Sequence, residues 1–420
     1  MAPEAPSVGQ VLTELFSTEW IERHARALGV VQRMRKIHPA ALFWTLVLGF
    51  GTGVHRSIGS LRRAFCQAAG MHVARSSFTP QLVGLLQAAV GMAREALVGA
   101  PLPQKDLLRV FRDVVIADGT VLTLWDLLRE TFPACAEGKA AAKLHVVFSV
   151  FGQTATQIKL PSQRPNEGKL LSIGPWVCGR LLLIDLGFFG YRLVDRIARN
   201  NGFFISRLKD TAHPLIVDVH QTWRGHAIPL VGKRIQDVVH ALHRQILDVQ
   251  VQVNVKRRKD RGRCRTLHRT FRRVGIRHPK TGKDPLYLTN IPAKILSARQ
   301  IKALYSARWL VELLFDHLKT HYRLEELPSE PPYVVQTLIY ASLLTWMADQ
   351  HMTQALGEQM EVASRRQAAV LAAFGPKLLE AVIRYLGLYQ GTCSLTQLIQ
   401  QELRDPNRNR QLLLQRAGFT

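Results

Sequence analysis

The chain has 420 residues, enough for about two or three domains, and 47% of them are hydrophobic, so a large buried core is expected. Its 56 Lys and Arg against 31 Asp and Glu give a formal net charge of +25, which favours a polyanionic partner, most often nucleic acid. The five cysteines are scattered without a C-x-x-C pair, so neither a disulfide framework nor a zinc site is predicted, which fits a reducing cytoplasm.

Residues 1 to about 105 have the patterning of helices throughout. The segments SIGSLRRAF and SSFTPQLVGLLQAA flank a turn at Gly70, an arrangement typical of a helix-turn-helix. On that interpretation Arg62, Arg63 and Arg75 would contact phosphates. The alternative is ordinary packing of short helices beside a basic turn.

Two apolar runs, at 40–54 and 334–348, are the most hydrophobic parts of the chain. The first is short for a membrane span and ends in glycines, and polar residues interrupt the second, so both are predicted to be buried core helices. The N-terminus lacks a basic segment followed by an apolar run, so no signal peptide is predicted.

The pattern changes at 109–124, where β-branched residues cluster and predict a strand. Further strands are predicted at 143–152, 154–162, 180–190 and 202–209. The run RLLLIDLGFFG at 180–190 is continuously apolar, as expected for a central buried strand. Between these strands EGKLLSIG and YRLVDRIARNN are predicted to be helical.

From about 210 to 295, short β-like pieces alternate with turn residues. This region contains the densest basic run of the chain, VKRRKDRGRCRTLHRTFRR, at 255–273. Helical patterning resumes at about 297 and is expected to continue to the C-terminus.

Two aspartates follow apolar predicted strands, Asp118 after VVIA and Asp185 after LLLI. Each caps the following segment, or the two strand ends lie side by side and share a divalent cation such as Mg²⁺, which prefers oxygen ligands. Glu312, on a later helix, would complete a site for two metal ions about 4 Å apart, with Asp316 as the alternative on that helix. The other nearby acids are predicted to lie at the surface or before the strand: Asp126, Glu130, Asp195 and Asp113.

The segment YSARWLVELLFDHLK is predicted to form one helix from Tyr305 to Lys319. Tyr305, Arg308, Glu312 and Lys319 fall within an arc of roughly 60° on a helical wheel. The apolar residues expected to face the core are Leu304, Ala307, Leu310, Val311, Leu314 and Leu318. The polar stripe is either a solvated face with an Arg308–Glu312 pair or a row of functional groups.

Three motifs occur in one order: ADGT at Asp118, IDLGFFGY at Asp185, and Y-x₂-R-x₃-E-x₆-K from Tyr305 to Lys319. In this the chain resembles the DDE transposases of the IS4 insertion-sequence family, whose relatives include the Tn5 transposase, over roughly residues 105–350. The resemblance implies an α/β fold with an RNase H-like catalytic core and a β-rich insertion, flanked by N- and C-terminal helical regions.

The resemblance also implies a division of the chain. The expected parts are a helical DNA-binding region at 1–105, the first part of the core at 106–209, the basic β-rich insertion at 210–295, the Glu-bearing part of the core at 296–350, and a C-terminal helical region for dimerisation at 351–420.

By this resemblance, the catalytic residues and metal ligands are Asp118, Asp185 and Glu312, which would hold two Mg²⁺ ions, with Mn²⁺ as a substitute. Tyr305, Arg308 and Lys319 would hold DNA near the scissile phosphate.

Three further residues have two interpretations each. Trp309 is either a core residue or stacks on an extruded base, which aromatic rings favour. His145, on a strand near Asp118, is either structural or lies near the metals. Trp223, in the predicted insertion, is a weaker candidate for a role like that of Trp309.

The implied function is that of an insertion-sequence transposase. Such a protein binds terminal inverted repeats, cuts the element ends by metal-dependent phosphodiester hydrolysis and joins the 3′-hydroxyl ends to target DNA. It would work as a homodimer on DNA, in the cytoplasm at the nucleoid and without a membrane partner. The basic insertion and N-terminal helices would supply salt-sensitive DNA affinity. The alternatives are an RNase H-fold nuclease or resolvase without strand transfer, and an inactive DNA-binding derivative.

Overall fold

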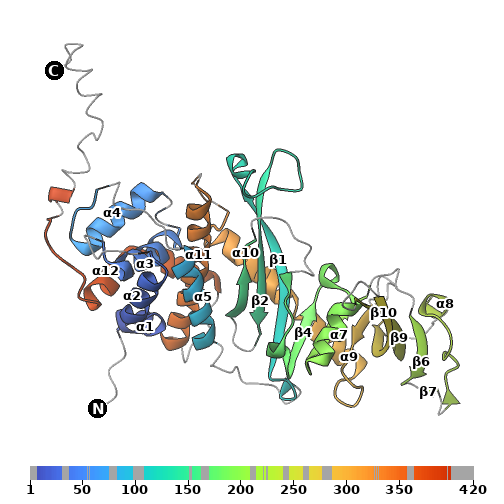
Figure 1. Ribbon diagram of the computed structural model, residues 1–420. Helices are drawn as coiled ribbons and strands as arrows, with labels where there is room; N and C mark the ends of the chain where they lie inside the picture. Colours follow the sequence, from blue (N-terminus) through green and yellow to red (C-terminus); the bar gives the residue numbers. More distant parts are fainter. Residues whose placement is uncertain are drawn as a thin grey trace, which may run out of the picture. The chain divides into compact units, whose positions relative to one another are not determined.

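The chain divides into two compact units, Arg94–Asp316 and the combination of Met1–Ala93 with His317–Thr420. Figure 1 shows the helices and strands of both units along the chain. The computed structural model describes residues 7–30, 37–53, 55, 57–74, 83–97, 108–150, 154–161, 170–208, 214–220, 222–223, 226–239, 246–258, 264–276, 286–325, 327, 329, 331–356, 364–394 and 396–398.

The unit Arg94–Asp316 is built on a mixed sheet, which among the described residues has nine strands in the order β3-β2-β1-β4-β5-β11-β10-β9-β6. The first half of this sheet consists of β1 (Asp113–Leu124), β2 (Ala140–Ser149), β3 (Thr154–Lys159), β4 (Arg180–Ile184) and β5 (Phe203–Arg207). Strand β1 pairs antiparallel with β2 and parallel with β4, and β4 pairs parallel with β5. Helix α7 (Tyr191–Arg199) makes the crossover that the parallel pair β4–β5 requires.

Strand β4 is shorter than the predicted strand at 180–190. It ends at Ile184, and the next residues form a 3₁₀ turn, η6 (Leu186–Phe188). The side chain of Phe188 packs into the core, together with Val194 and Ile197 of α7. The apolar run is therefore continuous because strand and turn are both buried, not because the strand is long.

The second half of the sheet comes from the predicted β-rich region. Its strands are β6 (Leu215–Val219), β9 (Ile246–Arg258), β10 (Cys264–Ile276) and β11 (Leu286–Thr289), and beside them lie the ribbon β7 (Thr222–Trp223) and β8 (His226–Ala227) and the helix α8 (Ile235–Val239). Strands β9 and β10 form a long antiparallel hairpin. Every second residue of β9 from Val249 to Val255 is at most 3% exposed, so one face of the hairpin joins the core.

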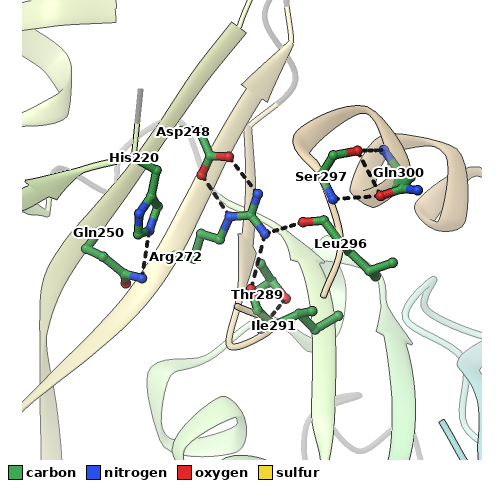
Figure 2. Close-up of polar contacts among 9 residues, drawn as sticks. All are labelled: His220, Asp248, Gln250, Arg272, Thr289, Ile291, Leu296, Ser297 and Gln300. Atoms are coloured by element: carbon green, nitrogen blue, oxygen red, sulfur yellow. Dashed lines mark hydrogen bonds and ion pairs between the residues drawn. The ribbon is translucent and has the colours of Figure 1, made fainter. Parts of the chain in front are cut away.

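A buried ion pair holds this hairpin to the segment that follows β11. Nε and Nη2 of Arg272 donate to the two carboxylate oxygens of Asp248 at 2.7 and 2.6 Å, and Nη1 donates to the carbonyl oxygens of Ile291 and Leu296 at 3.2 and 2.6 Å. Figure 2 shows the guanidinium of Arg272 between the carboxylate and these carbonyls. Arg272 is 2% exposed, so removing its guanidinium from water costs free energy. The two carbonyl oxygens offset part of this cost, because they accept hydrogen bonds from the N–H groups that do not face Asp248.

The same segment is fixed to β5 from its other side. Oγ1 of Thr289 donates to the carbonyl oxygen of Phe204 at 2.6 Å, and the side chain of Asn290 pairs with the backbone of Phe204 and Gly202 at 3.0 and 2.8 Å. Ser297 then begins helix α9 (Ala298–Ser306) with a capping box to Gln300, drawn in Figure 2. The start of α9 is thus positioned by both halves of the sheet.

The predicted single helix from Tyr305 to Lys319 is wrong, because the structure has two helices there. Helix α9 ends at Ser306, and α10 (Trp309–Thr320) begins after a turn at Ala307 and Arg308. In this turn the N–H of Arg308 donates to Tyr305 O at 3.1 Å, a 3₁₀ bond to the third residue back. The tighter winding rotates the later side chains, which is why Leu310 is 41% exposed although it was expected in the core.

The unit made of Met1–Ala93 and His317–Thr420 consists of packed helices within the described residues. They are α1 (Val8–Leu15), α2 (Thr18–Ala27), α3 (Pro39–Trp44), the π-helix η1 (Thr45–Phe50), α4 (Ile58–Ala69), α5 (Val83–Leu97), α11 (Pro332–Leu356) and α12 (Ser364–Tyr385). Helix α1 packs against α11 and α12, so segments from the two ends of the chain share one core (Figure 1).

Both apolar runs form buried helices, as predicted. The first contains α3 and η1, in which every residue is buried, and the second lies within α11. The two cross closely at Gly51, because a Cβ there would lie 1.7 Å from Oγ1 of Thr345. Within the described residues, no helix combines the length and apolarity that crossing a membrane requires.

The predicted helix-turn-helix is only partly within the described residues. Helices α4 and α5 are present, but residues 75–82, including Arg75, lie outside the described part. Arg62 does not face solvent as predicted: it is 9% exposed, and its Nη1 donates to the carbonyl oxygen of Val73 at 2.8 Å. Arg63 is exposed.

The buried pair between Arg272 and Asp248 generates a stability prediction. Arg272→Met should lower the free energy of unfolding by about 3–5 kcal/mol, because it leaves the Asp248 carboxylate buried without its cation. Urea unfolding followed by circular dichroism measures this. Arg269→Met, on the same strand, is the matched control, since its partner Asp195 keeps a second arginine, Arg199, and the loss should be much smaller. Equal losses in the two variants would contradict the prediction.

A second stability prediction concerns the fully buried Asp349, which accepts a hydrogen bond from the Tyr322 hydroxyl at 2.6 Å. Burial raises the pKa of Asp349 from 3.8 to about 6, against the effect of that hydrogen bond. Between these pKa values the folded state binds more protons than the unfolded state, so stability should fall as pH rises through that window. Asp349→Asn should remove this fall, as measured by unfolding at a series of pH values. If the free energy of unfolding changes with pH in the same way in both proteins, Asp349 is not the source of the fall.

Candidate active site

Asp118 lies within β1, opposite Val146 of β2. Its Oδ1 accepts a hydrogen bond from the backbone N–H of Gly119 at 2.7 Å, and its side chain is 16% exposed. The following glycine leaves little room, because a Cβ on Gly119 would lie 3.3 Å from Cε of Lys143 and 3.4 Å from the carbonyl oxygen of Leu144. The carboxylate thus sits at a tightly packed point of the sheet with one edge open to solvent.

Asp185 is the residue after β4, and it begins the turn η6. Because β1 and β4 are parallel and Ala117 pairs with Ile184, the next residue of each strand, Asp118 and Asp185, lies at the same level of the sheet. The side chain of Asp185 is 36% exposed. The adjacency that the sequence analysis expected for these two residues is therefore present.

Arg308 brings the three predicted acidic residues together. Its Nη1 donates to Oδ2 of Asp118 at 3.0 Å, and its Nε lies 3.7 Å from Oδ1 of Asp185. Its Nη2 donates to Oε1 of Glu312. Each nitrogen of one guanidinium therefore faces a different carboxylate, and the Arg308 side chain is 19% exposed.

Glu312 reaches the cluster from the first turn of α10, and its side chain is 35% exposed. The partial positive charge of a helix N-terminus favours a carboxylate at that position. Asp316, the alternative on this helix, is exposed, and none of the three ion pairs of Arg308 involves it. The geometry thus distinguishes the two acids of α10, which spacing alone did not.

The charge balance of the cluster is negative, since one guanidinium faces three carboxylates. Burial lowers the pKa of Arg308, but the hydrogen bond that Arg308 donates to Glu312 and the charge of Asp185 outweigh this effect, and the pKa is raised overall. Arg308 is therefore a cation near pH 7.

Tyr305 lies at the end of α9 and is 8% exposed. Its hydroxyl is 3.5 Å from the carbonyl oxygen of Ile184, the last residue of β4, and its ring packs against Tyr287 with centroids 5.0 Å apart. Burial and the nearby charge of Asp185 raise the pKa of the Tyr305 hydroxyl well above its usual range. Tyr305 therefore connects α9 to the strand end that carries Asp185, and its contact with DNA stays a prediction.

Trp309 and Lys319, the remaining predicted DNA-binding residues, lie at the two ends of α10. Trp309 is 60% exposed, so it is not a core residue. Lys319 pairs with Glu325 at 2.9 Å and belongs to the helical unit. The side chain of Trp223 lies outside the described residues.

His145 is a buried neighbour of this site. It pairs with Gly119 across β1 and β2, is 1% exposed, and packs against the ring of Phe188 with centroids 5.3 Å apart. Burial lowers the pKa of His145 to about 4, so its imidazole is neutral near pH 7. The contact with Phe188, which lies in the turn η6, supports the structural interpretation of His145, and a position of His145 near bound metals stays a prediction.

The donor atoms of the cluster suit a magnesium ion. Asp118, Asp185 and Glu312 offer carboxylate oxygens, which Mg²⁺ prefers, and each is partly exposed, so water ligands have room. In the described part of the chain no three His, Cys, Asp or Glu side chains are close enough to hold one metal ion. The three carboxylates are instead arranged around the guanidinium of Arg308.

Two of the four other acidic residues of the region lie at the surface as predicted, and two do not. Asp126 and Glu130 are exposed, whereas Asp113, expected before the strand, is the first residue of β1 and is 5% exposed. Asp195 was expected at the surface but is 2% exposed, because Arg269 of β10 and Arg199 of α7 pair with it at 2.8 and 3.3 Å. Sequence spacing gave no sign of this contact, since 74 residues separate Asp195 from Arg269.

The basic run at 255–273 is not wholly a DNA-facing surface. Arg272 and Arg273, at its end, are 2% and 1% exposed, and Arg272 is used in the buried ion pair described above. Lys256 and His268 are exposed. The last two arginines of the run are therefore not surface charges, and a contribution of the basic insertion to DNA affinity stays a prediction.

Comparison with known proteins identifies the family of this chain. Residues 109–348 match the family described as "Transposase DDE domain". A protein of Geobacillus stearothermophilus described as a "Probable transposase for insertion sequence element IS5377" is 24% identical over 257 residues, 59% of this chain and 60% of that protein. This chain therefore matches less than two thirds of the length of that relative.

One solved structure, of the piggyBac transposase synaptic complex with hairpin DNA, aligns with a TM-score of 0.44 and 11% sequence identity. The alignment covers 97% of this chain and 84% of that one. The family match spans more than half of the chain and contains Asp118, Asp185 and Glu312. The chain belongs to the family of proteins with a transposase DDE domain.

Proposed function

We propose that this protein is the transposase of an insertion sequence of the IS4 type, which binds the terminal inverted repeats of its element, cuts the ends and joins the 3′-hydroxyl groups to target DNA. The observation that carries the proposal is the convergence of Asp118, Asp185 and Glu312 on the guanidinium of Arg308. These residues come from two adjacent strands and a helix, and the family match spans all of them.

An RNase H-like core is part of this proposal. The strand order β3-β2-β1-β4-β5, with β2 antiparallel to β1 and β1 parallel to β4, supports it, as does the site at the ends of β1 and β4. The β-rich region at 210–295, with strands β6 to β11, then represents the insertion between Asp185 and Glu312.

Asp118, Asp185 and Glu312 would hold two Mg²⁺ ions, or Mn²⁺ in their place. The chemistry that such ions supply when bound is activation of a water and stabilisation of the leaving 3′-oxygen. The protein residues set the geometry: the parallel register of β1 and β4 fixes the spacing of the two aspartates, and α10 presents Glu312 beside them. Partial exposure of all three carboxylates leaves the site open to a DNA strand.

Contact with DNA is assigned to residues around this site. Arg308 suits a phosphate, because a guanidinium binds phosphate oxygens through paired N–H groups. Trp309 follows it directly, and its exposed ring is free to stack on an extruded base. Lys319 contributes a further charge for the backbone, and Tyr305 positions α9 against β4.

The net charge of +25 supports DNA as the partner, for both the element ends and the target. A homodimer on paired ends, action at the nucleoid in the cytoplasm and dimerisation through the C-terminal helices complete the proposal.

Substitution of the three acidic residues tests the proposal. Asp118→Asn, Asp185→Asn and Glu312→Gln should each reduce cleavage of element-end DNA by about 10³-fold or more, because each removes a ligand charge, while DNA affinity stays within about threefold. The measurement uses plasmid DNA carrying the element ends with Mg²⁺, and a gel-shift assay in parallel. Asp316→Asn is the matched control on α10 and should cut normally.

The products of that assay separate the possible activities. Metal-dependent excision with joined products supports a transposase, whereas free 3′-hydroxyl ends without joined products indicate a nuclease or resolvase. Binding without cutting indicates an inactive derivative. Normal cleavage by Glu312→Gln would show that the third carboxylate is wrongly assigned.

A separate prediction concerns Lys319. Lys319→Ala should weaken binding to element-end DNA and reduce the slope of log affinity against log salt by about one unit, because one phosphate contact is lost. Filter binding over a series of salt concentrations measures the slope. A slope identical to that of the unsubstituted protein would exclude Lys319 from the phosphate contacts.

A further inference from the structure

The guanidinium of Arg308 is placed unlike an ordinary surface arginine. An Arg–Glu pair four residues apart on a helix involves one carboxylate and contributes little to the stability of the protein. Here Nη1 of Arg308 also donates to Asp118, which is 190 residues away in sequence, and Nε faces Asp185. The arginine is therefore the centre of the acidic cluster, not a neighbour of one member.

The turn between α9 and α10 explains how Arg308 reaches that centre. In a continuous helix the side chain would lie in line with Tyr305 and Glu312 along one face. The 3₁₀ bond from the N–H of Arg308 to Tyr305 O tightens the chain at this residue, and the hydroxyl of Tyr305 lies against the end of β4. The turn is thus positioned beside the strand end that precedes Asp185.

A metal ion needs the same carboxylate oxygens. Magnesium holds its oxygen ligands at about 2.1 Å, much closer than the 3.0 Å from Nη1 of Arg308 to Oδ2 of Asp118. Carboxylates that surround a guanidinium are too far apart to share an ion at that distance. A divalent cation in the cluster would also repel the fixed positive charge of Arg308.

We propose that Arg308 is the resident counter-ion of Asp118, Asp185 and Glu312 in the metal-free protein, and that it leaves these carboxylates when a divalent cation binds. The arginine keeps three like charges together until the metal replaces it, so metal and guanidinium compete for the same oxygens.

The exchange has a consequence for DNA binding that rests on the proposed function. A DNA phosphate is an alternative partner for the guanidinium that Arg308 releases. DNA that takes Arg308 frees the carboxylates, so DNA and metal should each increase the affinity of the protein for the other. The site would then assemble fully only when its substrate is bound.

Metal affinity without DNA tests the exchange directly. Mn²⁺ binding to the full-length protein is measured by titration calorimetry at fixed salt. Arg308→Gln should raise the Mn²⁺ affinity by about tenfold or more, because the competing charge is gone. Arg299→Gln removes the same charge from an exposed position on α9 and should change the affinity by less than about twofold. An affinity for Mn²⁺ that is unchanged or weaker in Arg308→Gln would overturn the proposal.

A second variant covers the case in which Arg308→Gln does not fold. Arg308→Lys keeps one charge but loses the fork that reaches three carboxylates, so its Mn²⁺ affinity should also exceed that of the unsubstituted protein.

A short duplex of element-end DNA tests the coupling between DNA and metal. It should raise the Mn²⁺ affinity of the unsubstituted protein and have a much smaller effect on the Mn²⁺ affinity of Arg308→Gln. Equal effects of DNA on both proteins would exclude the coupling.

A third variant, Asp118→Asn, distinguishes failure of the exchange from failure of the proposed function. Asp118→Asn must lose Mn²⁺ affinity if these carboxylates bind metal at all, and its failure to do so would refute the metal site and with it the transposase proposal. If Asp118→Asn loses affinity while Arg308→Gln gains none, the metal site stands and only the exchange is refuted.

Discussion

Three carboxylates of like charge lie together in this protein because one guanidinium holds them. Without Arg308, Asp118 and Asp185 would repel each other at the ends of two parallel strands, and Glu312 would have no reason to point toward them. The carboxylates are partly exposed, so the free-energy cost of removing them from water is moderate, and their excess negative charge attracts cations. The rest of the unit Arg94–Asp316 can be understood as the support that places this arginine.

That support begins far from the site. The buried pair of Arg272 and Asp248 fixes the loop at Ile291 and Leu296, and Thr289 and Asn290 fix the same loop to β5. The capping box of Ser297 starts α9 from this loop, and α9 ends at Ser306, two residues before Arg308. The hairpin β9–β10 therefore has a structural role, because its buried arginine sets the position of the helix that leads to the site.

The helical unit is held together mainly by the packing of apolar helices. Its core depends on apolar helices from both ends of the chain, and Gly51, directly after η1, lets the backbone approach Thr345 of α11 closely. One carboxyl group, Asp349, lies inside this core and is paired with Tyr322. Burial of this carboxyl group makes the stability of the unit depend on pH, because it raises the pKa of Asp349 against the effect of the hydrogen bond.

The sequence alone determined much about this protein. Apolar runs ending in Asp118 and Asp185, and the spacing from Tyr305 to Lys319, were enough to indicate a DDE transposase, because motif spacing reflects local structure. They also predicted the three acidic residues that the structure brings together around Arg308. Tertiary structure decided what spacing cannot express. It broke the helix at Arg308, buried Asp195 and Arg272 against partners far away in sequence, and joined the β-rich region to the main sheet. These features depend on contacts between distant segments, and a one-dimensional pattern records which side chains are available but not which distant partner satisfies them.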